Sequence, residues 1–205
     1  MIITEIKRKS NRRYKLFVDD NEFGEFDIEV ISLLGAKQGF ECDEVFLENL
    51  QTEEERRRAK ERALYLLEYR DHSKKELIDK LCRSYSKEIA RETADKMEHL
   101  GFLDDAKYAK KLAKRQLLQK KLGKPRAVYE LCLKGIPKEL AQEAVENIET
   151  DPIEQICELF SKKYPDAVED IKVEKRAVAA AARRGYGYSD IRAALKRLKE
   201  ENNGY

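Results

Sequence analysis

The sequence lacks the motifs on which most enzymes depend. It contains only two histidines, His72 and His99, and none of the phosphate-binding or nucleophile runs GxxxxGK[ST], GxGxxG or GxSxG. Both histidines lie at the ends of predicted helices, where a structural or solvent-facing role explains them. The acid pair Asp104–Asp105 suits a helix cap better than a metal site. We therefore expect no catalytic residue, no metal and no cofactor, and a protein that is not an enzyme.

The cysteines are few and widely spaced, and no two of them form a CxxC pair. Such spacing does not favour a structural metal centre or a redox pair. Cys82 and Cys132 each follow a leucine predicted to lie in the core. We interpret the cysteines as small, buried apolar residues; they are Cys42, Cys82, Cys132 and Cys157.

No apolar run approaches the length needed to cross a membrane. The longest is Ala177 to Ala182, and the first ten residues contain no apolar core of signal-peptide length. We therefore expect a cytoplasmic protein that does not bind membranes.

Neither sign of charge dominates overall, but the two signs are segregated along the chain. The 42 basic and 40 acidic side chains leave a net charge of +2. The segment from Asp19 to Leu50 is strongly acidic, whereas Asp104 to Lys134 and Asp170 to Lys199 are basic. This asymmetry indicates polyanions or acidic protein surfaces as partners of the later segments.

Three stretches repeat one apolar pattern at a spacing of fifty residues. Each has apolar side chains at i, i+1, i+4 and i+5, which is one face of a helix. Gly135 and Gly185 follow the second and third stretches, where a left-handed helix cap favours glycine. Such a period indicates an array of small helical units that form docking surfaces. The three sets are Leu77-Ile78-Leu81-Cys82, Ala127-Val128-Leu131-Cys132 and Ala177-Val178-Ala181-Ala182.

The helix signals divide the chain into a head and three repeats. β-Branched and aromatic residues over 2–26 predict short strands, followed by helices near 27–34 and 43–50. From Thr52 onward only helices are predicted, the first over 52–69. Capping residues and prolines at helix starts then mark three helices in each repeat, with caps at Ser73 (a capping box with Glu76), Ser86, Asp104 and Asp151. The predicted fold is mainly α, an elongated array of three tandem three-helix (helix-turn-helix-like) repeats with a small N-terminal β-containing module. The predicted domains are a β/α head at 1–52 and three-helix repeats at 53–103, 104–150 and 151–205.

The helix that begins at Asp104 has two unlike faces, an apolar face around Tyr108 and Leu112 and a basic face opposite, at 100° per residue. Leu118 falls among the lysines. The predicted stripe consists of Lys107, Lys110, Lys111, Lys114 and Lys121.

The basic region continues beyond this helix, and no acid stands between Asp105 and Glu130 to neutralise it. A solvated helix face also carries lysines, but a surface that merely keeps a protein in solution normally mixes both signs. We therefore predict that this region follows DNA phosphates or docks on an acidic protein groove. The continuing residues are Arg115, Lys120, Lys124 and Arg126.

The third repeat offers a second basic set. Tyr186 and Tyr188 lie between its helices, and arginine with interleaved tyrosine can hold a nucleic-acid backbone and stack on bases. The same tyrosines also suit a plain inter-helix turn that packs over the core, which is the interpretation we favour. Of this basic set, we add Arg183 and Arg184 to the candidate binding residues.

Beyond these patterns, the run from Leu100 to Ala109 resembles the signature of the RecX family of recombinase regulators, in which glycine, two hydrophobic residues, Asp or Asn, Asp, any two residues, an aromatic residue and alanine follow one another. The segments 63–70 and 73–77 resemble the family's first repeat, and 123–126, 130–131 and 134–136 resemble its second. The resemblance spans about residues 53 to 200, and the acidic head resembles the N-terminal extension of Gram-positive members.

This resemblance implies a regulator that binds RecA filaments in the helical groove and modulates, mostly inhibiting, ATP hydrolysis, strand exchange and LexA co-cleavage. It thereby implies roles in homologous recombination, DNA repair and the SOS response. We expect a monomer that also binds single- or double-stranded DNA weakly and without specificity. The motif does not identify the residues that touch RecA, so the basic stripe is our own hypothesis.

Two other functions fit parts of the pattern. A helix-turn-helix protein could act directly on duplex DNA, because three-helix units with a basic helix can enter the major groove. No helix here, however, presents Arg, Asn and Gln together for reading bases. A scaffold of the tetratricopeptide type would need a repeat of about 34 residues, which this period does not match.

Overall fold

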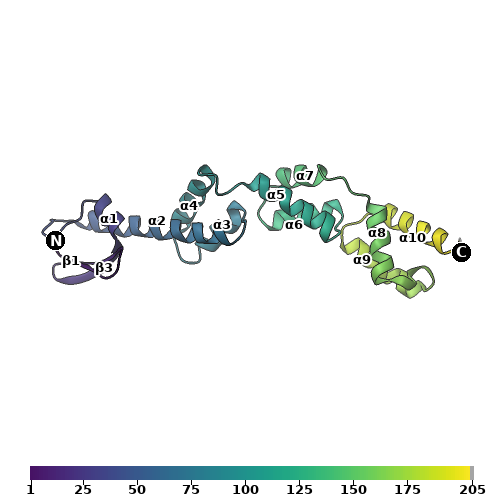
Figure 1. Cartoon of the computed structure of the whole chain (residues 1–205), viewed down its shortest axis with the longest axis horizontal. Coiled ribbons are helices and arrows are strands. Elements are labelled where there is room, and N and C mark those ends of the chain that lie inside the picture. The colour runs from purple at the N-terminus through teal and green to yellow at the C-terminus, as the bar shows by residue number, and fades with distance from the viewer. Residues whose placement is uncertain (204–205) are drawn as a thin grey trace. The chain divides into compact units, whose positions relative to one another are not determined.

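The structure, a computed structural model, describes residues 1–203 and comprises two compact units (Figure 1). The first contains Met1–Asp71 and Leu77–Leu103, and the second contains His72–Glu76 and residues 104–203. It is mainly helical, with one small sheet at the N-terminus, as predicted.

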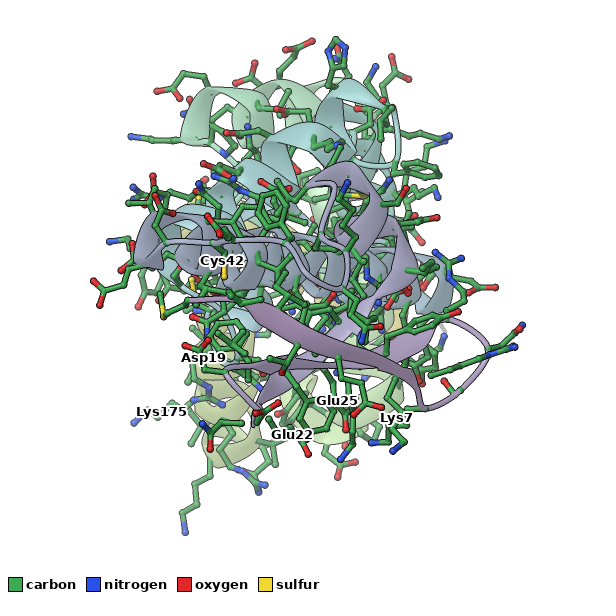
Figure 2. The ribbon with its side chains drawn as sticks, turned by 90° about the vertical axis from the view of Figure 1, so that its left-hand side faces the viewer. Lys7, Asp19, Glu22, Glu25, Cys42 and Lys175 are labelled. Atoms are coloured by element: carbon green, nitrogen blue, oxygen red, sulfur yellow. The ribbon has the colours of Figure 1, made fainter. Side chains whose placement is uncertain are left out.

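The head is a three-stranded antiparallel sheet in the order β1-β2-β3, covered on one face by helices. Alternation along the strands puts Ile3, Leu16 and Phe26 into a buried cluster. Figure 2 shows Glu22 and Glu25 on the face of the sheet that points away from the helices of the head; Glu22 pairs with Lys15 of β2, and Glu25 pairs with Lys9, just after β1. The elements are β1 (Ile3–Arg8), β2 (Arg13–Val18), β3 (Asn21–Asp27) and α1 (Ile28–Leu33).

One long helix, α2 (Glu44–Tyr69), replaces the two helices predicted at 43–50 and 52–69. No glycine or proline separates the two segments, so nothing interrupts helix propagation. Leu50 faces the cluster of the head, whereas Ala63 faces the next cluster along the chain. The boundary that we predicted at residue 52 therefore falls inside a continuous helix.

A buried ionic network fixes α2 to the sheet. Glu54 is 4% exposed and accepts hydrogen bonds from the Asp27 backbone N–H at 2.8 Å, from Arg58 Nε at 2.8 Å and from Arg13. Asp27, 1% exposed, caps α1 by accepting from the Glu29 N–H at 2.9 Å. Burial alone would raise the pKa of Asp27, but the Glu29 hydrogen bond and nearby arginines outweigh burial and lower it.

The helices α3 (Lys74–Leu81) and α4 (Lys87–His99) follow, and both start at the predicted serines. Ser73 Oγ accepts from the Glu76 N–H at 3.0 Å and the Glu76 carboxylate accepts from the Ser73 N–H at 3.3 Å, which is the expected capping box. Ser86 caps α4 through the Ile89 N–H. Leu77, Leu81 and Met97 join Ala63 of α2 in one buried cluster.

The expected burial of Cys82 is wrong. Leu81 faces the core, and the next residue along a helix points about 100° away, so Cys82 is exposed. Cys132 is half-buried, Cys42 and Cys157 are buried, and all four thiols are free.

The second unit contains two helical triplets, each with its own core. The first is α5 (Asp105–Lys114), α6 (Lys124–Leu133) and α7 (Lys138–Glu146), and the second is α8 (Pro152–Lys163), α9 (Ile171–Arg183) and α10 (Tyr188–Asn203). Leu112, Leu131 and Val145 centre the first core, and Phe160, Ala177 and Ile191 centre the second. Short segments complete the unit, namely the π-helical η1 (Arg115–Gln119) and the 3-10 helix η2 (Pro165–Val168).

Two equivalent hydrogen bonds, fifty residues apart, join a helix start to a backbone carbonyl in this unit. Ser73 Oγ donates to the Lys134 carbonyl at 2.5 Å, and Gly123 N–H donates to the Arg184 carbonyl at 2.9 Å. In each case, the residue at the start of one helix donates to the carbonyl just before a glycine at positive φ, in the turn that follows another helix. A Cβ on Gly185 would lie 2.5 Å from that of Arg126, so only glycine fits there.

Candidate binding surface

The exposed face of α5 carries the lysines that the sequence predicted. Asp104 caps this helix by accepting from the Lys107 N–H at 2.8 Å. Its apolar side is buried around Tyr108 and Leu112, so the opposite side is left to solvent. Four cations there are exposed and form no ion pair with any of residues 1–203; they are Lys107, Lys110, Lys114 and Arg115. Lys111 is exposed on the same helix.

Lys121 does not belong to this face, contrary to our prediction. The α-helix ends at Lys114 and gives way to η1, in which the Lys120 N–H donates to the Arg115 carbonyl, five residues back. The wider π turn breaks the 100° spacing that placed Lys121 on the stripe. Lys121 itself lies beyond the helix at φ +52.

Lys121 instead pairs with Glu158 of α8, with Nζ 2.5 Å from the carboxylate. The hydrogen bond from Lys121 lowers the pKa of Glu158. Arg126 pairs with Glu130, which lies one helical turn further along α6, at 2.6 Å. The expectation that no acid neutralises the basic region that begins at α5 is therefore wrong for these two cations.

The predicted exposure of Leu118 is confirmed, because its side chain is 47% exposed while the preceding Leu117 is fully buried. Lys124 is exposed and its Nζ lies 3.5 Å from the Glu146 carbonyl at the end of α7, a favourable place for a cation.

Arg184 has a structural role in addition to its charge. Its guanidinium donates to the Lys120 carbonyl at 2.7 Å, while its own carbonyl accepts from the Gly123 N–H. Arg184 therefore joins the turn after α9 to the segment between η1 and α6. This joint fixes the two triplets of the second unit against each other.

Tyr186 completes the joint, and its predicted packing over the core is confirmed. Its hydroxyl lies 2.9 Å from both the Lys121 carbonyl and Gln155 Oε1, and Gln155 Nε2 donates to the Leu117 carbonyl at 3.1 Å. Burial raises the pKa of Tyr186 to about 12. Tyr188, by contrast, is 66% exposed, so the prediction that both tyrosines pack is wrong for Tyr188.

Five predicted cations come together beside this joint, at an open groove of about 600 Å³. The groove is bounded by the η1–α6 segment, by α8 and by the end of α9. Glu130 and Glu158 are the acids in its lining, and both already pair with lysine or arginine. The cations that line it are Lys120, Lys121, Arg126, Lys162, Lys163, Arg183 and Arg184.

Lys162 and Lys163 are the groove residues that sequence reasoning missed. They lie in the last turn of α8, where lysine is expected simply because it complements the helix dipole. Together with Lys120 and Arg183, they are exposed and form no ion pair with a described residue. The lining therefore keeps a strong positive excess.

An aromatic side chain stands next to this groove. The Arg126 guanidinium lies over the Tyr129 ring, 4.9 Å from its centroid, and Tyr129 is 51% exposed. Leu133, four residues further along α6, is also exposed. The surface thus combines unpaired cations with an aromatic ring that a ligand can reach.

Other kinds of site find little support in the part of the chain that the structure describes. Residues 1–203 contain no cluster of three or more His, Cys, Asp or Glu side chains that could hold a metal ion. Within the same range, no helix is both long and apolar enough to cross a membrane. His72 is buried and His99 is exposed at the end of α4.

Comparison with known proteins places the chain beside one group. Residues 59–97 match the first three-helix domain of RecX, and residues 104–145 match the second. The regulatory protein RecX of Caldanaerobacter subterraneus subsp. tengcongensis is 30% identical over 179 residues, which cover 85% of this chain and 90% of that protein. That of Clostridioides difficile (strain 630) is 27% identical over 202 residues, covering 96% and 95%.

Solved structures agree on the fold. A crystal structure of regulatory protein RecX has a TM-score of 0.73 and 18% identity, covering 95% of this chain and 98% of that one. The crystal structure of RecX from Lactobacillus salivarius has a TM-score of 0.61 and 21% identity, covering 70% and 96%.

Proposed function

The chain belongs to the RecX family, and from this premise we propose that it regulates RecA by binding RecA nucleoprotein filaments in their helical groove. Binding modulates, and mostly inhibits, the RecA ATPase, strand exchange and co-protease activity. The relatives are named regulatory proteins, and we expect this chain likewise to act by binding rather than by catalysis.

The observation that carries this proposal is the exposed face of α5. Lys107, Lys110 and Lys114 present unpaired charge beside the exposed Leu118. A nucleoprotein filament carries the phosphates of its DNA, so an unpaired cationic face is attracted to it and the attraction weakens with salt. An exposed leucine among the cations adds an apolar contact that a protein groove can bury.

A direct effect on duplex DNA is the alternative. The second helices of the two triplets in this unit, α6 and α9, contain no asparagine or glutamine. These helices therefore lack the amide side chains that read adenine in the major groove. Their cations would hold phosphates and position the protein without specifying a sequence.

The test is RecA ATP hydrolysis on single-stranded DNA, titrated with the full chain. Lys107→Glu/Lys110→Glu/Lys114→Glu should raise the concentration that gives half-inhibition by about a hundredfold. Each exposed contact stabilises binding by about 0.5 kcal/mol, and reversing its charge adds repulsion of similar size. Far-UV circular dichroism checks that the variant keeps its helix content.

The matched control is Lys172→Glu/Lys175→Glu/Arg176→Glu, which makes the same charge change on the exposed start of α9. It should inhibit like the unchanged protein. Equal loss in both triple variants would mean that overall charge alone matters, and a wild-type chain that leaves ATP hydrolysis unchanged would refute the proposed function. Repression of a duplex reporter without RecA would support the alternative instead.

A further inference from the structure

We propose that the groove between the two triplets of the second unit binds a single strand of nucleic acid. Lys162, Lys163 and Arg183 hold consecutive phosphates, and Tyr129 stacks on a base at the rim. This inference rests on the proposed function for one point, namely that the strand is the DNA of the RecA filament. The site itself consists of residues of this chain alone.

The charge of the lining selects a polyanion. The two carboxylates in the groove already form ion pairs with cations at 2.5 and 2.6 Å, so they offer little further neutralisation. Lys162, Lys163 and Arg183 are exposed on two different helices and lack such partners among residues 1–203. A ligand with regularly spaced negative charges would neutralise all three at once.

The aromatic rim favours nucleic acid over an acidic peptide. Tyr129 is half exposed, and the Arg126 guanidinium stacks on its ring. An unpaired base can stack on an exposed ring or guanidinium plane, whereas aspartate and glutamate side chains have no ring to offer. In a duplex the bases are stacked on one another and stay out of reach, so the groove prefers a single strand.

The groove is preorganised by contacts within the chain. Arg184 and Tyr186 bond to backbone carbonyls on the opposite wall, and Gly123 and Gly185 allow the two backbones to meet. The cations of α8 and α9 are therefore held near one another without a ligand. Less ordering on binding leaves more of the electrostatic attraction as affinity.

The experiment is fluorescence anisotropy of a labelled oligothymidine of about 16 nucleotides with the full chain and without RecA. If three or four phosphates are neutralised, log affinity should fall with log salt at a slope of about −2 to −3. Lys162→Glu/Lys163→Glu/Arg183→Glu should remove most of that slope and weaken binding at least tenfold at low salt. Lys172→Glu/Lys175→Glu/Arg176→Glu, the same charge change elsewhere on α9, should keep both slope and affinity.

The stacking half of the proposal has its own pair of variants. Tyr129→Ala should weaken binding by roughly five- to a hundredfold, as loss of base–aromatic stacking does, with the salt slope unchanged. Tyr129→Phe keeps the ring and should bind as the unchanged protein does. Circular dichroism confirms that each variant is folded.

Several outcomes would overturn the inference. One is an equal loss of oligonucleotide affinity in the groove and control triple variants, and another is a salt slope that stays unchanged in the groove variant. A third is an unchanged affinity in Tyr129→Ala. A fourth is displacement of the oligonucleotide by equimolar free ATP, which would indicate a mononucleotide site. The two proposals fail separately. A chain that inhibits RecA but does not bind the oligonucleotide refutes only this inference, and a chain that binds it without affecting RecA refutes only the proposed function.

Discussion

Alanine substitutions at three glycines should separate the two physical reasons for glycine at the joint between the triplets. At Gly185, φ is +87 and an added Cβ would lie 2.5 Å from Arg126 Cβ. At Gly101, φ is +76 but the space is open. At Gly123, the Cβ would lie 2.4 Å from the Gly185 carbonyl oxygen, without a positive φ. Gly101→Ala thus reports strain, Gly123→Ala reports overlap, and Gly185→Ala reports both.

The magnitudes follow from these distances. The left-handed conformation should cost alanine about 1–2 kcal/mol of stability, and forcing a methyl group into packed atoms about 1–3 kcal/mol. Gly185→Ala should therefore destabilise by about 2–5 kcal/mol, more than either of the other two. Gly187→Ala, in the same turn, is the control, since its Cβ would meet Asp190 at an ordinary 3.5 Å.

Urea denaturation followed by far-UV circular dichroism gives the midpoints. Hydrogen exchange read by mass spectrometry then locates the loss, which should fall on α6, α8 and α9 for the two joint variants and on α4 for Gly101→Ala. Because Gly123→Ala and Gly185→Ala break one contact, the double variant should lose less than the sum of the two. A Gly185→Ala variant no less stable than Gly101→Ala would refute the role assigned to this contact.

Three further predictions concern buried polar groups. Glu54→Gln removes the negative charge to which Arg13 and Arg58 both donate. It should lower the free energy of unfolding of the first unit by about 2–3 kcal/mol, measured from the shift of its urea midpoint. A loss below about 0.5 kcal/mol, the size of a surface substitution, would contradict the network. Because the pKa of Asp27 is lowered in the folded protein, its carboxylate stabilises the fold above the unfolded pKa of about 3.9. This contribution is lost as the pH falls through the folded pKa. In acid titrations followed by circular dichroism, the stability of Asp27→Asn should therefore fall less steeply below about pH 4 than that of the unchanged protein. Burial raises the pKa of Tyr186 to about 12, so the neutral phenol stabilises the fold fully below about pH 10. This contribution declines as the pH rises toward 12. Tyr186→Phe should abolish that decline in thermal unfolding measured at alkaline pH.

Features set by a few neighbouring residues were predictable from the sequence. Ser73, Ser86, Asp104 and Asp151 cap the helices where expected, because a cap needs only the residue itself and the amides just beyond it. The three strands and the apolar faces of α5 and α9 likewise follow from local alternation and periodicity.

Features that depend on distant contacts could not be predicted. The π turn at η1 removed Lys121 from its stripe, and its partner Glu158 lies 37 residues away. Lys162 and Lys163 join the groove only because the glycine joint brings α8 and α9 against the η1–α6 segment. A periodicity argument assumes one helix with constant pitch, and it fails where the pitch changes or where two triplets meet.

The single helix α2 has a mechanical consequence. Near its middle, Glu54 is fixed to the sheet through the Asp27 N–H, and Arg56 pairs with Glu92 of α4 at 3.0 Å. Because these two anchors lie two residues apart on one continuous helix, the sheet and α4 move together as one body. A partner that binds the sheet of the head therefore also changes the orientation of α4.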